Sequence, residues 1–172
     1  FSLRRLTETS ADESGFLLAP DGDKAVWLQG NGTLVLGDPE TLVVSRVLHV
    51  GFDAPRVEWS PDSAWLVWSV ANDDFNEDIW LARAEIEGLD AHVPGVKPWN
   101  LSSHPDDDTA PHWSPDGRKI VFTSRRRMLD ETDVWVAWLR REDVERTERE
   151  RLEAKEEEEK AEEEKEDEEE KE

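Results

Sequence analysis

The stretch Trp113-Ser114-Pro115-Asp116-Gly117 decides the fold, because the same turn occurs three times along the chain. Trp-Ser-Pro-Asp also stands at residues 59–62, and a degenerate copy, Leu-Ala-Pro-Asp, stands at residues 18–21. The three Pro-Asp pairs begin at residues 20, 61 and 115, at intervals of 41 and 54 residues. A period of about 40–45 residues is typical of four-stranded propeller blades. The repeat therefore points to a radial array of similar sheets.

The Ser-Pro-Asp-Gly string predicts a tight turn for identifiable reasons. Pro115 presets the φ angle that the turn needs, Asp116 can bond its neighbouring backbone, and Gly117 tolerates a positive φ. Gly22 holds the glycine position in the first copy, whereas Ser63 replaces it in the second, where we expect the turn to differ in detail. Since each turn lies between two apolar runs, each predicts a hairpin.

Apolar residues run continuously through the expected strands, as at residues 65–68 and 120–122. Such runs are typical of strands that are covered on both faces, as they are between neighbouring propeller blades. The chain holds nine Trp, and we expect six of them to fill the gaps between blades: Trp27, Trp59, Trp68, Trp80, Trp113 and Trp135. A carbohydrate-binding platform of Trp rings is the alternative, and strand-centre placement disfavours it.

These patterns predict an all-β chain, a partial β-propeller of about three four-stranded antiparallel blades, followed by a charged helical or disordered tail. We place the blades at residues 16–48, 56–102 and 111–139, with the tail at residues 140–172. The second blade carries a long insertion at residues 85–96, and the third lacks its fourth strand. Residues 1–7 resemble the last strand of a preceding blade, since Leu3-Arg4-Arg5-Leu6-Thr7 matches Trp99-Asn100-Leu101-Ser102.

We expect the chain to be a fragment of a longer protein. It starts with Phe1, and its repeats begin inside one blade and end inside another. About three blades cannot close a ring, and open arrays leave sheet edges exposed. The remaining blades of the parent chain are therefore expected partners.

The charge is strongly negative throughout, which disfavours nucleic acid as a partner. The net charge is −22, and residues 142–172 contain 19 acidic and 7 basic residues. Both the tail and the rest repel phosphate backbones. The Glu/Lys tail has i,i+4 charge pairs but no apolar heptad, which indicates a solvated helix fraying into disorder, as in a linker or insertion. Capture of cations or of a basic partner by the tail is the alternative.

The residues and segments that the sequence lacks limit the chemistry and the membrane topology that we expect. There is no Cys, so disulfides and thiol chemistry are excluded. No apolar run of about 18 residues exists, so we expect no membrane-spanning helix. The sequence does not fix the cellular location, and we favour the periplasm or cell envelope slightly over the cytoplasm.

Three clusters could suggest ligand sites, and each has a plainer explanation. His104, residues 106–108 and His112 could hold a metal, but such side chains equally cap turns before a blade. Residues 74, 76, 78 and 85 echo a calcium loop, but Ile79 stands where the loop requires glycine. The run Arg125-Arg126-Arg127 is flanked by acids at residues 130, 131 and 133, which indicates a paired loop and not a phosphate clamp.

No catalytic constellation is visible in the chain. There is no Gly-x-Ser-x-Gly motif and no glycine-rich phosphate cradle, since Gly30-Asn31-Gly32 suits a hairpin turn. We therefore assign no catalytic, cofactor-binding or metal-binding residue, and expect no cofactor.

Residues 108–125, DTAPHWSPDGRKIVFTSR, closed by Asp133-Val-Trp-Val, resemble the Pro-Asp repeat of the TolB and tricorn-type propeller families. The propellers of prolyl-oligopeptidase-like enzymes carry the same repeat. The resemblance covers residues 1 to about 139 and implies the fold more strongly than the function. The Glu/Lys run after Leu139 is similar to the charged insertion of some tricorn-like proteins.

The tricorn-like resemblance implies a parent serine peptidase with two propellers, a PDZ-like module and a C-terminal catalytic core. In that family the propeller filters and channels peptides, so this chain would gate or recruit peptide substrates without cleaving them. Two alternatives remain: a TolB-like propeller that binds proteins and has no enzyme, and the lid propeller of a prolyl-oligopeptidase-like hydrolase. The sequence that follows in the gene would discriminate among the three.

Overall fold

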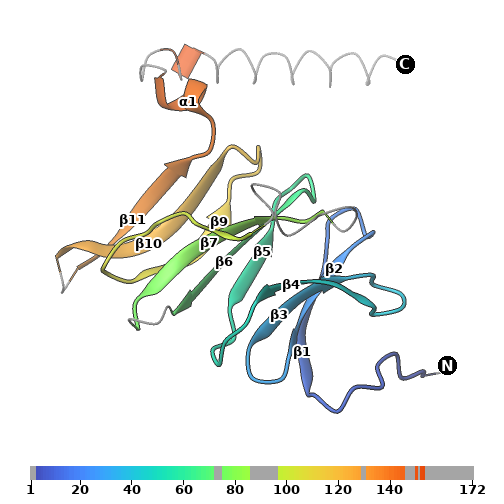
Figure 1. Ribbon diagram of the computed structural model, residues 1–172. Helices are drawn as coiled ribbons and strands as arrows, with labels where there is room; N and C mark the ends of the chain where they lie inside the picture. Colours follow the sequence, from blue (N-terminus) through green and yellow to red (C-terminus); the bar gives the residue numbers. More distant parts are fainter. Residues whose placement is uncertain are drawn as a thin grey trace, which may run out of the picture. The chain divides into compact units, whose positions relative to one another are not determined.

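Each of the three expected blades folds as one antiparallel sheet in the computed structural model, which describes residues 3–71, 75–85, 97–128, 131–145, 150 and 152–153. Sheet 1 has the order β1 (Glu13–Leu18), β2 (Ala25–Gln29), β3 (Thr33–Gly37), β4 (Val44–His49). Sheet 2 has the order β5 (Arg56–Trp59), β6 (Trp65–Ala71), β7 (Glu77–Arg83), β8 (Trp99–Asn100). Sheet 3 has the order β9 (Asp108–Trp113), β10 (Lys119–Met128), β11 (Glu131–Trp138). Sheet 2 lies between the other two in the row (Figure 1).

The three Pro-Asp turns have the same backbone geometry. In each, the amide before the proline donates to the carbonyl oxygen five residues later, over 2.9 Å from Ala19, 2.9 Å from Ser60 and 3.0 Å from Ser114. The residue after the aspartate has a positive φ in every copy: 80° at Gly22, 59° at Ser63 and 65° at Gly117. The expectation that the Ser63 turn differs is therefore wrong for the backbone, because serine here adopts the left-handed conformation of its glycine counterparts.

Side chains reinforce the second and third turns. The carboxylate of Asp62 accepts hydrogen bonds from the Ser60 hydroxyl at 2.5 Å and from the amide of Ala64 at 3.1 Å. The Ser60 bond, with the amide bond, holds the pKa of Asp62 below its usual value. Burial raises the pKa of Asp116, but hydrogen bonds from Ser114 and the amide of Arg118 outweigh burial, so this pKa also lies below its usual value. The ionised carboxylates therefore stabilise these turns.

Sheets 1 and 2 pack face to face through one apolar cluster. Trp59 and Trp68 fill the gap, as the sequence predicts, and pack with Val26, Leu34, Leu36, Leu48 and Leu66. Hydrogen bonds cross the same boundary: Trp59 Nε1 donates to the carbonyl oxygen of Leu17 at 3.3 Å, the amide of Asp21 donates to Ser63 Oγ at 3.0 Å, and the Arg46 guanidinium donates to the carbonyl oxygen of Arg83 at 2.9 Å. The first two bonds join residues 42 positions apart, so each spans about one repeat.

Sheet 3 meets sheet 2 through β9, which packs against β5, β6 and β7. The Glu58 carboxylate accepts a hydrogen bond from the amide of Trp113 at 3.2 Å, and lies 2.7 Å from Nδ1 of His112. The amide of Glu77 donates to Asp107 Oδ1 at 3.1 Å. Hydrogen bonds to carboxylates thus contribute to the boundary between sheets 2 and 3.

Three expectations from the sequence concern residues outside these sheets. Residues 3–9 form no strand, because none of the described residues pairs with them, so their assignment to a preceding blade stays a prediction. The expected insertion at residues 85–96 lies, apart from its first residue, outside the described residues. The structure divides after Ala137 into a second unit, in which α1 (Arg141–Glu145) is held by an ion pair between Arg141 and Glu145 at 2.6 Å.

Candidate functional site: an apolar pocket between two sheets

A pocket of about 620 Å³ opens between sheets 1 and 2, at the strand ends away from the Pro-Asp turns. β6 starts just after its Pro-Asp turn, so Val70 and Ala71 at its end lie at the opposite end of the sheet. His49 ends β4 at the same level, and Trp80 of β7 lies deeper in the pocket wall. The chain that connects β4 to β5 supplies the remaining wall at residues 50–53, and Phe75 completes the lining.

The rim of this pocket is apolar and faces solvent. Phe52 and Phe75 are 89% and 90% exposed, and Val50 is exposed beside them. Solvated aromatic rings around a concave site are typical of surfaces that bind other molecules. Its size also lies in the range of about 300–1,000 Å³ that ligand pockets occupy.

Two polar groups lie in the pocket wall with their nitrogens buried. Neither His49 Nε2 nor Trp80 Nε1 has a hydrogen-bond partner among the described residues. Burial lowers the pKa of His49, and the nearby charge of Asp53 only partly opposes that effect. The imidazole is therefore neutral at pH 7.

Two glycines let the wall close tightly around His49 and Asp53. A Cβ atom added to Gly51 would stand 2.4 Å from His49 Nε2, so only glycine permits this contact. Gly32 has a φ of 147°, and a Cβ there would stand 2.6 Å from the carbonyl oxygen of Asp53. Gly30-Asn31-Gly32 is thus a three-residue hairpin loop that supports the pocket wall, in place of the two-residue turn that its chemistry suggests.

The arrangement suits the binding of an apolar group. Its wall is mostly apolar, and Asp53 is the one carboxylate among its lining residues. A large apolar side chain can therefore enter the pocket. No serine lines this pocket, so among its lining residues no hydroxyl nucleophile is available.

The candidate metal ligands of the sequence are kept apart. His104 Nδ1 accepts a hydrogen bond from the amide of Asp106 at 3.2 Å and lies 3.5 Å from the carboxylate of the same residue. His112 instead lies against Glu58, across the boundary between sheets 2 and 3. Across the part of the chain that the structure describes, no three His, Asp or Glu side chains are grouped to hold a metal ion.

The calcium-like run is divided between a strand and its flanks. Asp74 lies outside the described residues, whereas Asp78 lies in β7 and Glu85 beyond its end. Asp78 is buried and accepts hydrogen bonds from Asn100 at 2.9 Å and from Ser102 at 3.2 Å. Its carboxylate therefore ties the outer strand of sheet 2 in place.

The expected loop at Arg125-Arg126-Arg127 is a strand, which corrects the sequence interpretation. These residues continue β10, and their acidic partners precede or begin β9 instead of lying in the flanking run at residues 130–133. Arg126 pairs with the fully buried Asp108, and its guanidinium stacks 5.0 Å from the Trp135 ring. Arg125 lies 3.9 Å from Asp107. The basic run is engaged within sheet 3 at two of its three positions.

The sequence analysis missed Phe52 and Phe75. Its signals all came from the periodic strands, whereas these two residues lie in the polar connections after β4 and after β6. One signal in the sequence could have identified them. Each is a large apolar residue isolated among Gly, Asp and Asn, as Phe52 is in Val50-Gly51-Phe52-Asp53, so burial in a strand does not explain its presence.

Comparison with solved structures identifies the architecture. A crystal structure of the tricorn protease matches with a TM-score of 0.56 and 16% identity, covering 70% of this chain and 12% of that one. TolB from Acinetobacter baumannii matches with a TM-score of 0.53 and 15% identity, covering 79% of this chain and 32% of that one. The chain is a partial β-propeller. At such low identity, the likeness shows the fold alone.

The other comparisons add no family assignment to the propeller. No family model matches the chain, and no curated protein is similar enough to count as a relative. The chain spans 12% of the tricorn protease and 32% of TolB, so the activities of those whole proteins are matters for proposal. In the described part of the propeller chain and its tail, no helix is long and apolar enough to cross a membrane.

Proposed function

We propose that this partial propeller is a non-catalytic part of a tricorn-like serine peptidase, where it recruits or gates peptide substrates. The observation that carries the proposal is the apolar pocket between sheets 1 and 2, with the exposed rings of Phe52 and Phe75 at its rim. An extended peptide could place one large apolar side chain in the pocket.

A second function, protein binding by a TolB-like propeller with no attached enzyme, is favoured by the match to TolB. Both functions use the same surface, and neither requires cleavage by this chain. They differ in what else the parent protein contains. A peptidase core encoded after this segment would support the first, and a closed ring without one would support the second.

Peptide binding can be tested directly with a defined probe. The probe is a nine-residue Gly/Ser peptide with one central Phe, and the control probe has Ser at that position. We expect the Phe peptide alone to shift the Trp80 indole N–H resonance in a nitrogen-15 correlation spectrum. Phe52→Ser with Phe75→Ser should remove the shift, because the rim then loses its apolar contact.

Val43→Ser is the matched control, because Val43 is an exposed apolar residue at the opposite end of sheet 1. It should leave the shift unchanged. Equal shifts with both peptides, or a response that survives the double substitution, would contradict the assignment of this pocket. We also expect the chain to leave both peptides intact by mass spectrometry, and turnover lost on replacing one of its serines would refute a non-catalytic role.

A further inference from the structure

Two arginines of this chain show which groups bind a guanidinium in this protein. The Arg83 guanidinium lies over the Trp65 ring, 5.1 Å from its centroid, and donates to the Glu85 carboxylate at 3.0 Å. Arg126 has the same two kinds of partner, the Trp135 ring at 5.0 Å and a buried carboxylate. In both cases an aromatic ring lies against the flat face of the cation and a carboxylate accepts its N–H groups.

The rim of the pocket between sheets 1 and 2 offers both kinds of group but no cation. The rings of Phe52 and Phe75 are exposed there, and Asp53, which follows Phe52 in the chain, is exposed as well. Among the described residues, the Asp53 carboxylate accepts no hydrogen bond and forms no ion pair. The lining residues that the structure describes include no Lys or Arg. The partners of a guanidinium are therefore present without one.

Arg56, the arginine nearest to this rim in the sequence, points away from the pocket. In the same strand, β5, the side chains of Val57 and Trp59 pack in the cluster that joins sheets 1 and 2. Side chains alternate along a strand, so Arg56 and Glu58 lie on the opposite face. Glu58 confirms this placement, because it contacts His112 of sheet 3. β5 therefore brings no cation to the pocket.

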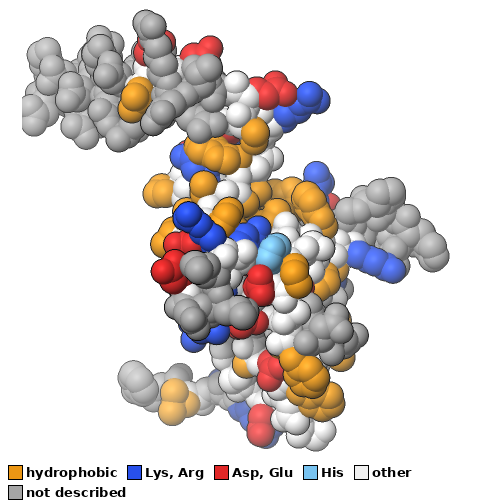
Figure 2. Space-filling view, turned by 90° about the vertical axis from the view of Figure 1, so that its left-hand side faces the viewer, with side chains coloured by type: hydrophobic (Ala, Val, Ile, Leu, Met, Phe, Trp, Pro, Cys, Tyr) orange, Lys and Arg blue, Asp and Glu red, His pale blue; other side chains and the backbone are white. Residues whose placement is uncertain are grey.

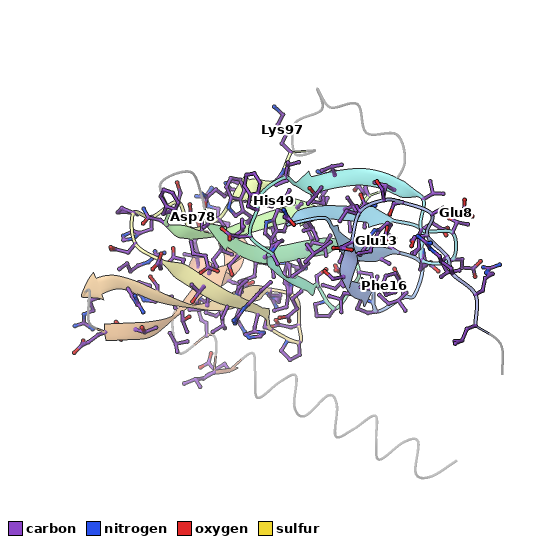
Figure 3. All side chains as sticks on the ribbon, turned by 90° about the horizontal axis from the view of Figure 1, so that it is seen from below. Glu8, Glu13, Phe16, His49, Asp78 and Lys97 are labelled. Carbon is purple, nitrogen blue, oxygen red and sulfur yellow. The ribbon has the colours of Figure 1, made fainter. Side chains whose placement is uncertain are left out.

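The pocket wall is neutral or negative. Burial lowers the pKa of His49, so its imidazole adds no positive charge at pH 7. Asp78 pairs across the strands with Val70 of the wall and so lies on the same face of sheet 2; Figure 3 labels His49 and Asp78. The hydrogen bonds that Asp78 accepts from Asn100 and Ser102 come from uncharged groups. A concave site with negative groups and apolar walls favours a cationic ligand over an anionic one.

We infer that the pocket selects a peptide in which an arginine stands next to the large apolar side chain. The apolar side chain enters the pocket, and the guanidinium lies against the ring of Phe52 or Phe75 with Asp53 as its acceptor. Lysine binds less well, because an ammonium group has no flat face for a ring and cannot form two parallel bonds with a carboxylate. This inference rests on the proposed function, since it requires the pocket to bind a peptide.

The experiment compares Gly/Ser peptides with a central Phe that is followed by Arg, citrulline, Lys or Glu. Citrulline keeps the shape of arginine and lacks its charge. Isothermal titration calorimetry with the 172-residue chain measures each dissociation constant. We expect the Arg peptide to bind about three- to tenfold more tightly than the citrulline peptide, since an exposed ion pair and an exposed cation–π contact each contribute modestly. The Lys peptide should fall between these two, and the Glu peptide should bind most weakly.

Salt should reduce this preference. Raising the salt concentration from about 10 mM to about 1 M shortens the range of exposed charges roughly tenfold, so the Arg and citrulline peptides should become nearly equal. The affinity of the citrulline peptide depends on apolar burial and should not fall.

A matched pair of substitutions separates the pocket from the general charge of the surface. The chain has a net charge of −22, and Asp and Glu side chains are spread over the face that Figure 2 shows, so a basic peptide could adhere elsewhere. Asp53→Asn and Glu40→Gln each remove one exposed negative charge, and Glu40 lies before β4, at the end of sheet 1 away from the pocket. Asp53→Asn should reduce the preference for Arg over citrulline to less than about half. Glu40→Gln should leave that preference unchanged, and neither variant should alter the affinity of the citrulline peptide.

The outcomes separate this inference from the proposed function. Equal affinities for the Arg and citrulline peptides, with binding that still needs Phe and the rings of Phe52 and Phe75, would overturn the inference and leave peptide binding in place. A preference for Arg that Glu40→Gln lowers as much as Asp53→Asn would also overturn it, because the cation would then respond to the surface charge as a whole. If none of the peptides binds, the proposed function is wrong and the inference is wrong with it.

Discussion

Replacing Trp68 with alanine tests whether the gap between sheets 1 and 2 is the stabilising core of the fold. Trp68 is 1% exposed and lies in the cluster that joins the two sheets. Truncating a buried Trp typically destabilises a protein by about 3–5 kcal/mol, from lost apolar burial and the cavity that remains. Small domains have only ~5–15 kcal/mol of stability, so Trp68→Ala should remove a large part of it.

Trp99→Ala is the control, since Trp99 is 64% exposed in the outer strand of sheet 2. Urea unfolding followed by far-ultraviolet circular dichroism measures both variants without relying on Trp fluorescence. We expect the urea midpoint to fall strongly for Trp68→Ala. For Trp99→Ala the free energy of unfolding should fall by less than about 1 kcal/mol. Equal losses would refute the reasoning, because they would mean that sheets 1 and 2 do not pack through Trp68.

Three further substitutions or conditions have expected outcomes. Asp108→Ala should destabilise sheet 3 by about 3–5 kcal/mol, because it leaves Arg126 without its buried counter-ion, and thermal melting measures this. Gly117→Ala should destabilise by about 1–2 kcal/mol through backbone strain alone, since a Cβ there would meet no atom nearer than 3.8 Å; Gly117→Asn should lose less. Burial keeps the pKa of His49 in the folded protein below its value in the unfolded chain. The free energy of unfolding should therefore have its full value above about pH 6.5 and fall as the pH drops through the folded pKa. In His49→Gln that part of the pH dependence should vanish.

The sequence predicts the three sheets well because their signals are local. A Pro-Asp turn between two apolar runs needs no distant partner to form a hairpin, and all three hairpins lie where the turns place them. The Ser63 turn shows the limit of this reasoning. Its sequence departs from glycine, yet the hydrogen bond between Ser63 and Asp21 of the neighbouring turn accompanies the same backbone, and that contact is not visible in the local sequence.

The pocket could not be predicted in the same way. It brings together the end of β4, the end of β6 and the middle of β7, which are distant in the sequence and become neighbours only when two sheets pack. Likewise, the basic run of β10 finds Asp107 and Asp108 across its sheet, although closer acids follow it in the chain. Strand pairing, and not sequence distance, selects these partners.

The hydrogen bonds that link Leu17 to Trp59 and Asp21 to Ser63 imply a particular mechanical behaviour. Because both bonds join residues about one repeat apart, each sheet is held in place by its immediate neighbours. A molecule stretched between its termini in an optical trap should then yield in discrete steps, one sheet at each step. Damage to one sheet would loosen the adjoining one and leave the sheet beyond it intact.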